Sequence, residues 1–561
     1  MDNVVKQREL TFTSIFLGVL LAVVFGAANA YLGLRVGLTV SASIPAAVVS
    51  MGVLRFVLRR DSMLENNMVQ TIGSAGESLA AGAIFTMPAL YLWADEGVCA
   101  PPGFMSLTVI ALAGGALGVL FMIPLRRPLI VDEEKTLAYP EGCACAEVIK
   151  AGEKGARHAS TVFTGLGIAV AVKLVTDLFK WIPAAFSMPV RLIRGELGVE
   201  TSPALLGVGF IVGPKISTLL FSGAFLGWMV LIPLFCVYMP DAARAYADGG
   251  AVAVWKTYIR FVGAGAIATG GLYSLVKSVP LFVKTFRDSL KGVGTAKDGE
   301  DISMRKVVTA VVAIIVILAA LPTVPVGIGG ALLVALFGFF FAAVSARMVG
   351  FVGSSNNPVS GMTIATLVVS AFVLKTCGTV GAAGMVASIS IGSFVCIIAA
   401  LAGDTAQDLK TGRILGATPW KQQIGEFVGA AAAGLAIVGV LLLLHRAWGF
   451  GGDEIPAPQA TLMKVVVEGI MGGTLPWGLL ALGAGLAVVL IICRVPVMPF
   501  SIGLYLPIKL NATIFIGGML RLLMDRRYPA VTNPGVLLSA GLIAGEGICG
   551  IALAIVTIMI K

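Results

Sequence analysis

Length, composition and charge place this sequence in a membrane. The chain has 561 residues, of which 58% are hydrophobic and only 12% are charged, and it contains 69 glycines. Soluble domains carry about 45 to 50% apolar residues and about 25% charged ones. This chain has too little charge to solvate a globular surface, which excludes a soluble multidomain enzyme and a disordered chain.

The net charge of +10 reflects topology. Basic residues cluster in short loops, at 55–60, 126–127 and 284–291, as expected of loops held on the cytoplasmic side. We therefore predict no nucleic-acid partner. The basic residues before the first apolar run predict a cytoplasmic N-terminus in a multi-pass protein of the cell inner (plasma) membrane, with the lipid bilayer as its surroundings.

Apolar runs recur along the whole chain, and a spanning helix needs about 20 such residues. They predict spans at 11–32, 36–58, 71–93, 104–125, 160–181, 203–239, 255–281, 306–324, 328–350, 360–377, 380–402, 425–446, 476–493, 500–523 and 535–560. The fold class predicted is an all-α polytopic membrane helix bundle of about 14–16 spans. We expect broken or re-entrant helices. Gly213 and Pro214 divide 203–239, Leu506 and Pro507 interrupt 500–523, and 457–473 is either interfacial or re-entrant.

Internal repeats are predicted from three gapless matches that occur in the same order, at offsets of 324, 294 and 276 residues. Gly37, Thr39, Ala47 and Val49 match Gly361, Thr363, Ala371 and Val373; Gly209, Lys215, Phe221, Gly223 and Leu226 match Gly503, Lys509, Phe515, Gly517 and Leu520; Gly265, Ile267, Ala268 and Gly271 match Gly541, Ile543, Ala544 and Gly547. They predict a first membrane repeat at 1–290 with a cytoplasmic, partly helical loop at 126–158, a linker and connecting span at 291–327, and a second repeat at 328–561. Whether the repeats are parallel or inverted stays open.

Isolated charges inside the apolar runs are the first candidates for function, because such charges are costly and face a cavity or a partner. Glu77 lies between 11 and 17 uncharged residues and Glu546 between 18 and 14, and Lys215 and Lys509 are similarly isolated. A lone carboxylate away from water can gain and lose a proton near neutral pH, so Glu77 is our first candidate for proton coupling. The alternative is that Glu77 or Glu546 pairs with one of these lysines to hold helices together.

Helix breaks form a second group of candidates. Asn356 and Asn357 precede Pro358, and Asn533 precedes Pro534, the order expected of an N-cap followed by a first helical residue. A helix that begins inside the membrane directs free N–H groups and its positive dipole end at a cavity, which suits a carboxylate such as a peptide C-terminus. The alternative is an ordinary cap at the membrane surface.

Asp404 and Asp408 form a third group, because residues four apart share a helical face. This pair could hold a substrate ammonium, a proton or a divalent cation; the alternative is a solvated cytoplasmic start of a helix. The chain has only two histidines, no metalloprotease motif and no P-loop, and its cysteines lack metal-ligand spacing. We therefore predict no enzyme activity, no cofactor and no metal site, and an ion gradient as the energy source.

Four motifs in order resemble the oligopeptide transporter (OPT) family, and most of all its prokaryotic members, on the side of the family that includes the yellow stripe-like metal-chelate transporters. They are 66–71 running into 76–80, 354–366, 403–410 with 416–419, and 541–547. The resemblance implies a proton-coupled importer of about sixteen spans, built by duplication, that carries small peptides, glutathione-like peptides or metal chelates. From the first motif, Asn67 and Gln70 join the candidates for proton coupling or substrate binding. A passive channel or facilitator for small zwitterionic solutes stays open, as does a homodimer.

Overall fold

Helices make up nearly all of the computed structural model, which describes residues 9–37, 39, 41–59, 62–134, 137, 139–152, 157–190, 193–289, 300–354, 357–472, 476–526 and 534–560. The α-helices are α1 (Phe12–Val36), α2 (Ser43–Gly52), α3 (Met63–Ile84), α4 (Pro88–Asp95), α5 (Phe104–Met122), α6 (Pro140–Gly152), α7 (Arg157–Lys173), α8 (Pro203–Phe225), α9 (Ile232–Tyr238), α10 (Pro240–Val254), α11 (Arg260–Ser289), α12 (Met304–Ala320), α13 (Gly327–Val352), α14 (Val359–Thr376), α15 (Gly381–Leu415), α16 (Pro419–Trp448), α17 (Pro458–Met471), α18 (Trp477–Ile492), α19 (Val497–Tyr505), α20 (Ile508–Asp525) and α21 (Pro534–Ile560). Short π-helical or 3-10 turns lie at Val53–Val57, Ile123–Leu125, Arg127–Asp132, Leu174–Leu178, Leu226–Leu231 and Trp255–Ile259. The predicted all-α class is confirmed.

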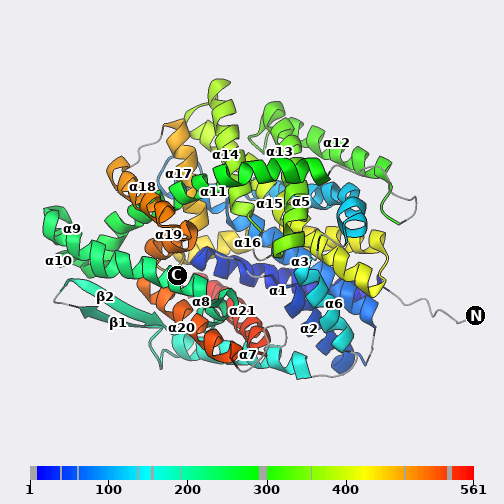
Figure 1. Ribbon diagram of the computed structural model, residues 1–561, viewed down its shortest axis with the longest axis horizontal. Helices are drawn as coiled ribbons and strands as arrows, with labels where there is room; N and C mark the ends of the chain where they lie inside the picture. The colour runs from blue at the N-terminus through cyan, green and yellow to red at the C-terminus, as the bar shows by residue number, and fades with distance from the viewer. Residues whose placement is uncertain are drawn as a thin grey trace, which may run out of the picture.

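One antiparallel hairpin was not predicted. Its strands are β1 (Ala185–Val190) and β2 (Gly195–Glu200), paired with Ala185 opposite Glu200. The hairpin lies at one edge of the molecule near α9 and α10 (Figure 1). Its inner end carries a charged group into the bundle, because Glu200 at the end of β2 is buried.

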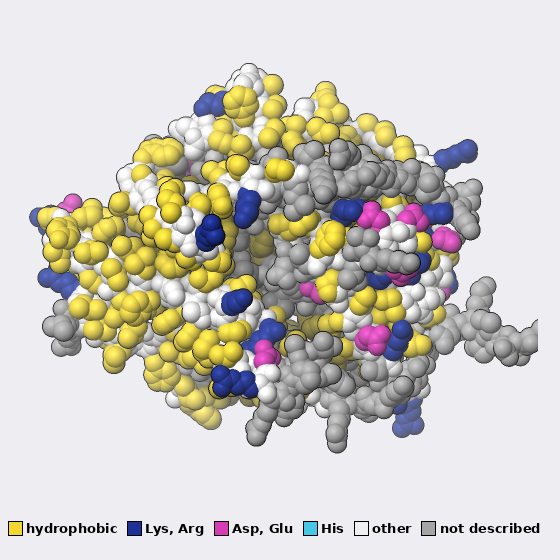
Figure 2. All heavy atoms as spheres, viewed as in Figure 1, with side chains coloured by type: hydrophobic (Ala, Val, Ile, Leu, Met, Phe, Trp, Pro, Cys, Tyr) yellow, Lys and Arg dark blue, Asp and Glu magenta, His cyan; other side chains and the backbone are white. Residues whose placement is uncertain are grey.

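Several helices are long and apolar enough to cross a bilayer. Within the described residues they are Phe12–Val36, Phe104–Leu125, Ser160–Leu178, Pro203–Tyr238, Gly327–Phe351, Val359–Thr376, Gly381–Leu415 and Pro419–Trp448, with shorter apolar helices at Ser43–Arg55, Trp477–Ile492 and Pro534–Gly550. Hydrophobic side chains coat much of the visible surface, most of the acidic groups lie on the right of the view, and the basic groups are scattered over it (Figure 2). This distribution suits a polytopic membrane protein, and the number of 14–16 spans stays a prediction.

The predicted helix breaks are present. Inside α8, Gly213 adopts φ 84° and ψ 175°, a left-handed conformation that interrupts the helix just before Pro214. Between α19 and α20, Leu506 is extended and Pro507 precedes the new helix. Residues 458–471 form α17, and the 126–158 loop is partly helical through α6, as predicted.

Helix α8 packs antiparallel against both α19 and α20, and the contacts repeat. A Cβ added at Gly209, Gly503, Gly223 or Gly517 would lie about 2 Å from the carbonyl oxygen of Ile514, Leu220, Phe500 or Leu206 respectively. Each contact maps onto another under the 294-residue offset, and the matched rings of Phe221 and Phe515 stack with centroids 4.9 Å apart. Glycine at these crossings lets two backbones touch, and the packing has local two-fold symmetry.

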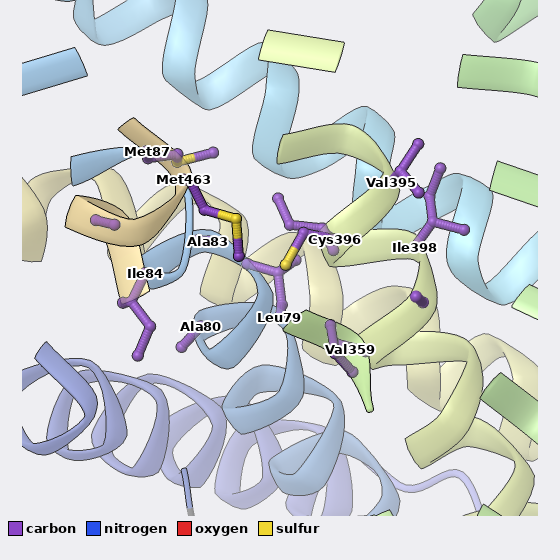
Figure 3. Close-up of a cluster of buried hydrophobic side chains, with 14 of the residues drawn as sticks. Leu79, Ala80, Ala83, Ile84, Met87, Val359, Val395, Cys396, Ile398 and Met463 are labelled. Atoms are coloured by element: carbon purple, nitrogen blue, oxygen red, sulfur yellow. The ribbon is translucent and has the colours of Figure 1, made fainter. Parts of the chain in front are cut away.

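Helices α3 and α15 cross at the centre of the molecule. A Cβ at Gly82 would lie 2.6 Å from the Cα of Ile397, so the two backbones are in close contact. Leu79 of α3, Cys396 of α15 and Met463 of α17 gather in one apolar cluster (Figure 3). This apolar layer lies directly beside the polar groups described next, and it keeps water away from them on that side.

Candidate functional site

A polar cavity of about 150 Å³ opens between α3, α15, α17 and the segments that lead into α2 and α14. Its polar lining residues are Thr39, Ser41, Glu77, Ser78, Ser354, Asn357, Ser360 and Gln459. At about 30 Å³ for each water, a volume of about 150 Å³ has room for roughly five waters. Such a space inside an apolar bundle suits a small polar ligand.

Glu77 supplies the negative charge of this cavity. Its side chain is only 4% exposed; Asn29 of α1 donates a hydrogen bond to Oε1, and the backbone N–H of Ala42 donates one to Oε2 at 3.4 Å. Ala42 precedes the first turn of α2, so a helix N-terminus faces the carboxylate. No lysine, arginine or histidine among the described residues forms an ion pair with it. The alternative that Lys215 or Lys509 neutralises Glu77 is therefore wrong.

Two more helices begin at the cavity. Helix α14 starts at Val359 after Pro358, and α17 starts at Pro458, immediately before the cavity-lining Gln459. The first N–H groups of a helix lack partners within it and attract negative charge. The cavity thus offers an anion site at these helix ends and a cation site at Glu77.

Asn357 lies where the sequence placed it, at the helix break before α14. Its Nδ2 donates a hydrogen bond to the Ser345 hydroxyl at 2.7 Å, while its Oδ1 is buried and has no hydrogen-bond partner within the described chain. The predicted site residue Asn356 lies outside the described residues, as does Asn533. Asn357 is thus a polar cavity group with a free acceptor.

A polar seam extends from the cavity along the contact between α3 and α15. Gln70 donates from Nε2 to Asp408 Oδ1, and one turn on Ser74 donates to Asp404 Oδ2, both at 2.6 Å. The next turn of each helix brings Ser78 and Ala400 to the cavity lining. Asp404 and Asp408 are each only 1% exposed in the middle of a 35-residue helix, so the alternative of a solvated helix start is wrong.

Glu426 of α16 joins the two aspartates, and the sequence reasoning missed it. One carboxylate oxygen from each of Asp404, Asp408 and Glu426 can be chosen so that all lie within 4.8 Å of one another, and Glu426 is fully buried. Eighteen uncharged residues follow Glu426, a signal comparable to that of Glu77. It was hidden because Lys421 and the end of a loop come only five residues earlier.

Lys410, on the same helix as the aspartates, points to a different partner. Its Nζ lies 2.9 Å from Glu134 Oε1, and an Arg413 nitrogen lies 2.9 Å from Glu134 Oε2. These two hydrogen-bonded cations lower the pKa of Glu134 to about 2. The positive charge of Lys410 is therefore paired with Glu134 and does not neutralise Asp404 or Asp408.

Asn67 is buried on α3, one turn before Gln70. Its side chain is 0% exposed, and within the described part of the chain neither its amide nitrogen nor its amide oxygen has a hydrogen-bond partner. With Gln70, Ser74 and Glu77 it continues a polar stripe at helical spacing. The stripe gives α3 one buried polar face, while its other faces are apolar.

Glu546 belongs to a separate, charge-balanced network. Ser202 Oγ donates to its carboxylate at 2.8 Å and the Ala204 N–H donates at 2.8 Å, both at the start of α8. Arg35 and Lys173 lie 3.6 and 3.8 Å away. Arg35 also contacts Glu200 at 2.5 Å. The alternative that Lys215 or Lys509 pairs with Glu546 is therefore wrong, and the sequence reasoning missed Arg35 and Lys173 as partners.

The two lysines lie apart from both sites. Lys215 is exposed beside the break in α8, Lys509 is half-buried at the start of α20, and neither forms an ion pair with another described residue. They occupy equivalent places after the two symmetric helix breaks. Their positions reflect the repeated architecture, and the structure brings neither one to the cavity.

The comparison with known families decides the identity. The profile of OPT oligopeptide transporter proteins matches residues 9–557. The chain belongs to the OPT oligopeptide transporter family. This confirms the resemblance seen in the four motifs, and with the long apolar helices it establishes a multi-pass membrane protein from a family of transporters.

Individual members of the family are similar along nearly their whole length. A Haemophilus influenzae protein named as an oligopeptide transporter is 35% identical, and the match covers 94% of this chain and 92% of that protein. The metal-nicotianamine transporter YSL3 of Arabidopsis thaliana and the iron-phytosiderophore transporter YSL15 of Oryza sativa are each 22% identical, with 97% of this chain and 90% of each relative covered.

Proposed function

We propose that this protein is a secondary active transporter that imports small peptides or metal–peptide chelates by symport with protons. The observation that carries the proposal is the central polar cavity, which presents one unpaired carboxylate and two helix N-termini inside an apolar bundle. The printed names of the relatives, which mention oligopeptides and metal chelates, support this substrate class.

The two ends of a zwitterion fit the two kinds of group in the cavity. A carboxylate of the substrate accepts hydrogen bonds from the N-termini of α14 and α17, and a positive centre, either an ammonium group or a chelated metal, lies against Glu77. A proton on one oxygen of Glu77 leaves the other oxygen free to accept a hydrogen bond from that positive end of the substrate, so proton and substrate can be bound together, as symport requires. Substrate binding and proton binding are thereby linked at one group.

Three further points complete the proposal. The symmetric glycine contacts of α8 with α19 and α20 support two membrane repeats at 1–290 and 328–561, joined by 291–327. The basic loops support a cytoplasmic N-terminus in the cell inner membrane. Transport proceeds without a chemical reaction, so no enzyme activity is proposed. Cross-linking in native membranes tests whether the protein forms a homodimer.

Accumulation in proteoliposomes tests the mechanism. With an inward proton gradient, we expect uptake of a transported peptide or chelate above the external concentration, abolished by a protonophore. Equilibration without accumulation, insensitive to the protonophore, would contradict symport and favour the passive facilitator.

The Glu77→Gln variant assigns the coupling role. We expect it to lose gradient-driven accumulation while it still exchanges substrate in counterflow, because the cavity keeps its shape and its helix ends. Glu468→Gln is the matched control, a buried carboxylate on α17 whose contacts are Trp93 and Lys464. Gradient-driven accumulation that persists in Glu77→Gln would remove Glu77 as the coupling group.

A further inference from the structure

The three buried carboxylates of Asp404, Asp408 and Glu426 lack a compensating positive charge. They are 1%, 1% and 0% exposed, and no described lysine, arginine or histidine lies within ion-pair distance of any of them. An uncompensated carboxylate in a protein interior costs several kcal/mol, and here three lie together. Such an arrangement needs positive charge from outside the chain.

Unsatisfied oxygen atoms of separate side chains converge on the same place. Asp404 Oδ1, Asp408 Oδ2 and both oxygens of Glu426 accept no hydrogen bond of good geometry among the described residues, although Thr405 and the Asp408 carboxyl lie beside Glu426. Gln70 is fully buried and touches Asp408 with its amide nitrogen, yet its amide oxygen also has no partner in that part of the chain. Buried polar atoms are normally hydrogen-bonded, so these free oxygens indicate a missing ligand.

The donor chemistry and the spacing select the ligand. Carboxylate and amide oxygens without nitrogen or sulfur suit hard cations. The chosen oxygens all lie within 4.8 Å of one another, close enough for one ion to contact the three carboxylates. Mg²⁺ gives up its waters reluctantly and is seldom held by protein ligands alone, whereas Ca²⁺ accepts such a site, so this buried cluster suits Ca²⁺ better. A divalent cation and one proton together cancel the three negative charges.

We propose that Asp404, Asp408 and Glu426, with the Gln70 amide, form a binding site for a hard divalent cation of the size of Ca²⁺. The site lies at the end of the polar seam between α3 and α15 that is farther from the cavity. Ser74 and Ser78 connect it to the cavity, so a cation reaches it from the cavity along hydroxyl groups. The site is distinct from Glu77, which lies one turn beyond Ser74.

Calorimetric titration of the detergent-purified full chain, stripped with EGTA, tests the proposal. We expect CaCl₂ to bind at one site per chain, and MgCl₂ to bind more weakly. The absence of Ca²⁺ binding by the wild-type protein would overturn the proposal, as would binding of Na⁺ alone or tighter binding of Mg²⁺. If the cluster holds only a shared proton, the wild-type protein will bind no Ca²⁺.

Variants locate the site. Loss of a group that only supports a metal ligand costs about 10- to 100-fold in metal affinity. Loss of a ligand charge in Asp408→Asn or Glu426→Gln should therefore weaken Ca²⁺ binding at least tenfold. Glu468→Gln should bind Ca²⁺ as the wild type does. Unchanged Ca²⁺ affinity in both cluster variants would contradict the assignment.

Thermal unfolding without Ca²⁺ separates ligand loss from misfolding. Glu426→Gln removes repulsion between carboxylates, so its midpoint should equal or exceed that of the wild type, while the rise produced by Ca²⁺ disappears. A lower midpoint in EGTA with an intact Ca²⁺-dependent rise would indicate a structural role instead. These measurements use neither substrate nor a proton gradient. Failure of the transport proposal would therefore not change the Ca²⁺ result, and failure of Ca²⁺ binding would not change the transport result.

Discussion

Glu77 and Glu546 look alike in the sequence, yet the structure places them in opposite electrostatic settings. Both are single carboxylates in long uncharged runs, and both are at least 96% buried. Each faces the N-terminus of another helix. Glu546 has Arg35 and Lys173 beside it, whereas Glu77 has an amide, a backbone N–H and a cavity. A paired buried charge holds helices together, and an unpaired one beside a cavity is available to a ligand.

The largest effect on the folded state is expected at Arg35. Arg35→Met leaves Glu200 without its closest positive partner and weakens the compensation of Glu546, which costs about 3 to 5 kcal/mol for a broken buried pair. We expect much less monodisperse protein after detergent extraction and a markedly lower thermal midpoint. Partial recovery in Arg35→Met combined with Glu200→Gln would show that the unpaired carboxylate is the cause, and full stability of the single variant would break the comparison.

A smaller loss is expected for Glu546→Gln. The amide keeps one acceptor oxygen but loses the charge-assisted contacts to Ser202 and Ala204, each worth about 1.5 to 3 kcal/mol when the acceptor is charged. Arg35 retains Glu200, which limits the damage. We expect a lower thermal midpoint with proton-driven accumulation retained per folded molecule; loss of accumulation at normal stability would give Glu546 a coupling role.

Glu77→Gln should change stability by less than about 1 kcal/mol, because removing an unpaired buried charge relieves its desolvation cost and offsets the weaker hydrogen bonds from Asn29 and Ala42. The Asn29 amide can still donate to the remaining oxygen of residue 77. Thermal unfolding compared directly with Glu546→Gln checks this. A drop as large as that of Glu546→Gln would mean that both carboxylates are structural.

The smallest effect is expected at the exposed contact of Glu134 with Lys410 and Arg413. The pKa of Glu134 falls from an ordinary value of 4.5 to about 2 in the folded state, so its contribution is present above pH 4.5 and is lost as the pH falls toward 2. Because Glu134 is half exposed, Glu134→Gln should cost less than about 1 kcal/mol at pH 7. The difference between variant and wild type should vanish near pH 2 in thermal unfolding, and a difference that grows there would contradict the assignment.

The sequence predicted the fold class and part of the candidate site because charge is scarce in this chain. Apolar runs, the breaks at Gly213 and Pro507, and the isolation of Glu77 are all local signals. Arg35, Lys173 and Glu426 were missed because each stands near the end of an apolar run, where a charge looks like part of a loop. Their roles depend on which helices meet in space, and the spacing of residues along one helix does not carry that information.

The β1–β2 hairpin was missed for a related reason. A search for runs of about 20 apolar residues does not detect strands of six residues. The hairpin matters to the comparison above because it delivers Glu200 to Arg35. Glu200, one member of the charge-balanced network, therefore comes from a β-strand, the element that the composition made least expected.

The glycine crossings of α8 with α19 and α20 restrict how the molecule can move. Because backbone meets backbone at four places, two on each partner helix, with no side chain between them, α8 cannot slide along these two helices without separating from them. We therefore expect the three helices to travel as one rigid body through any transport cycle. Whatever rearrangement admits and releases a substrate must then take place around it, at surfaces where flexible side chains form the contact.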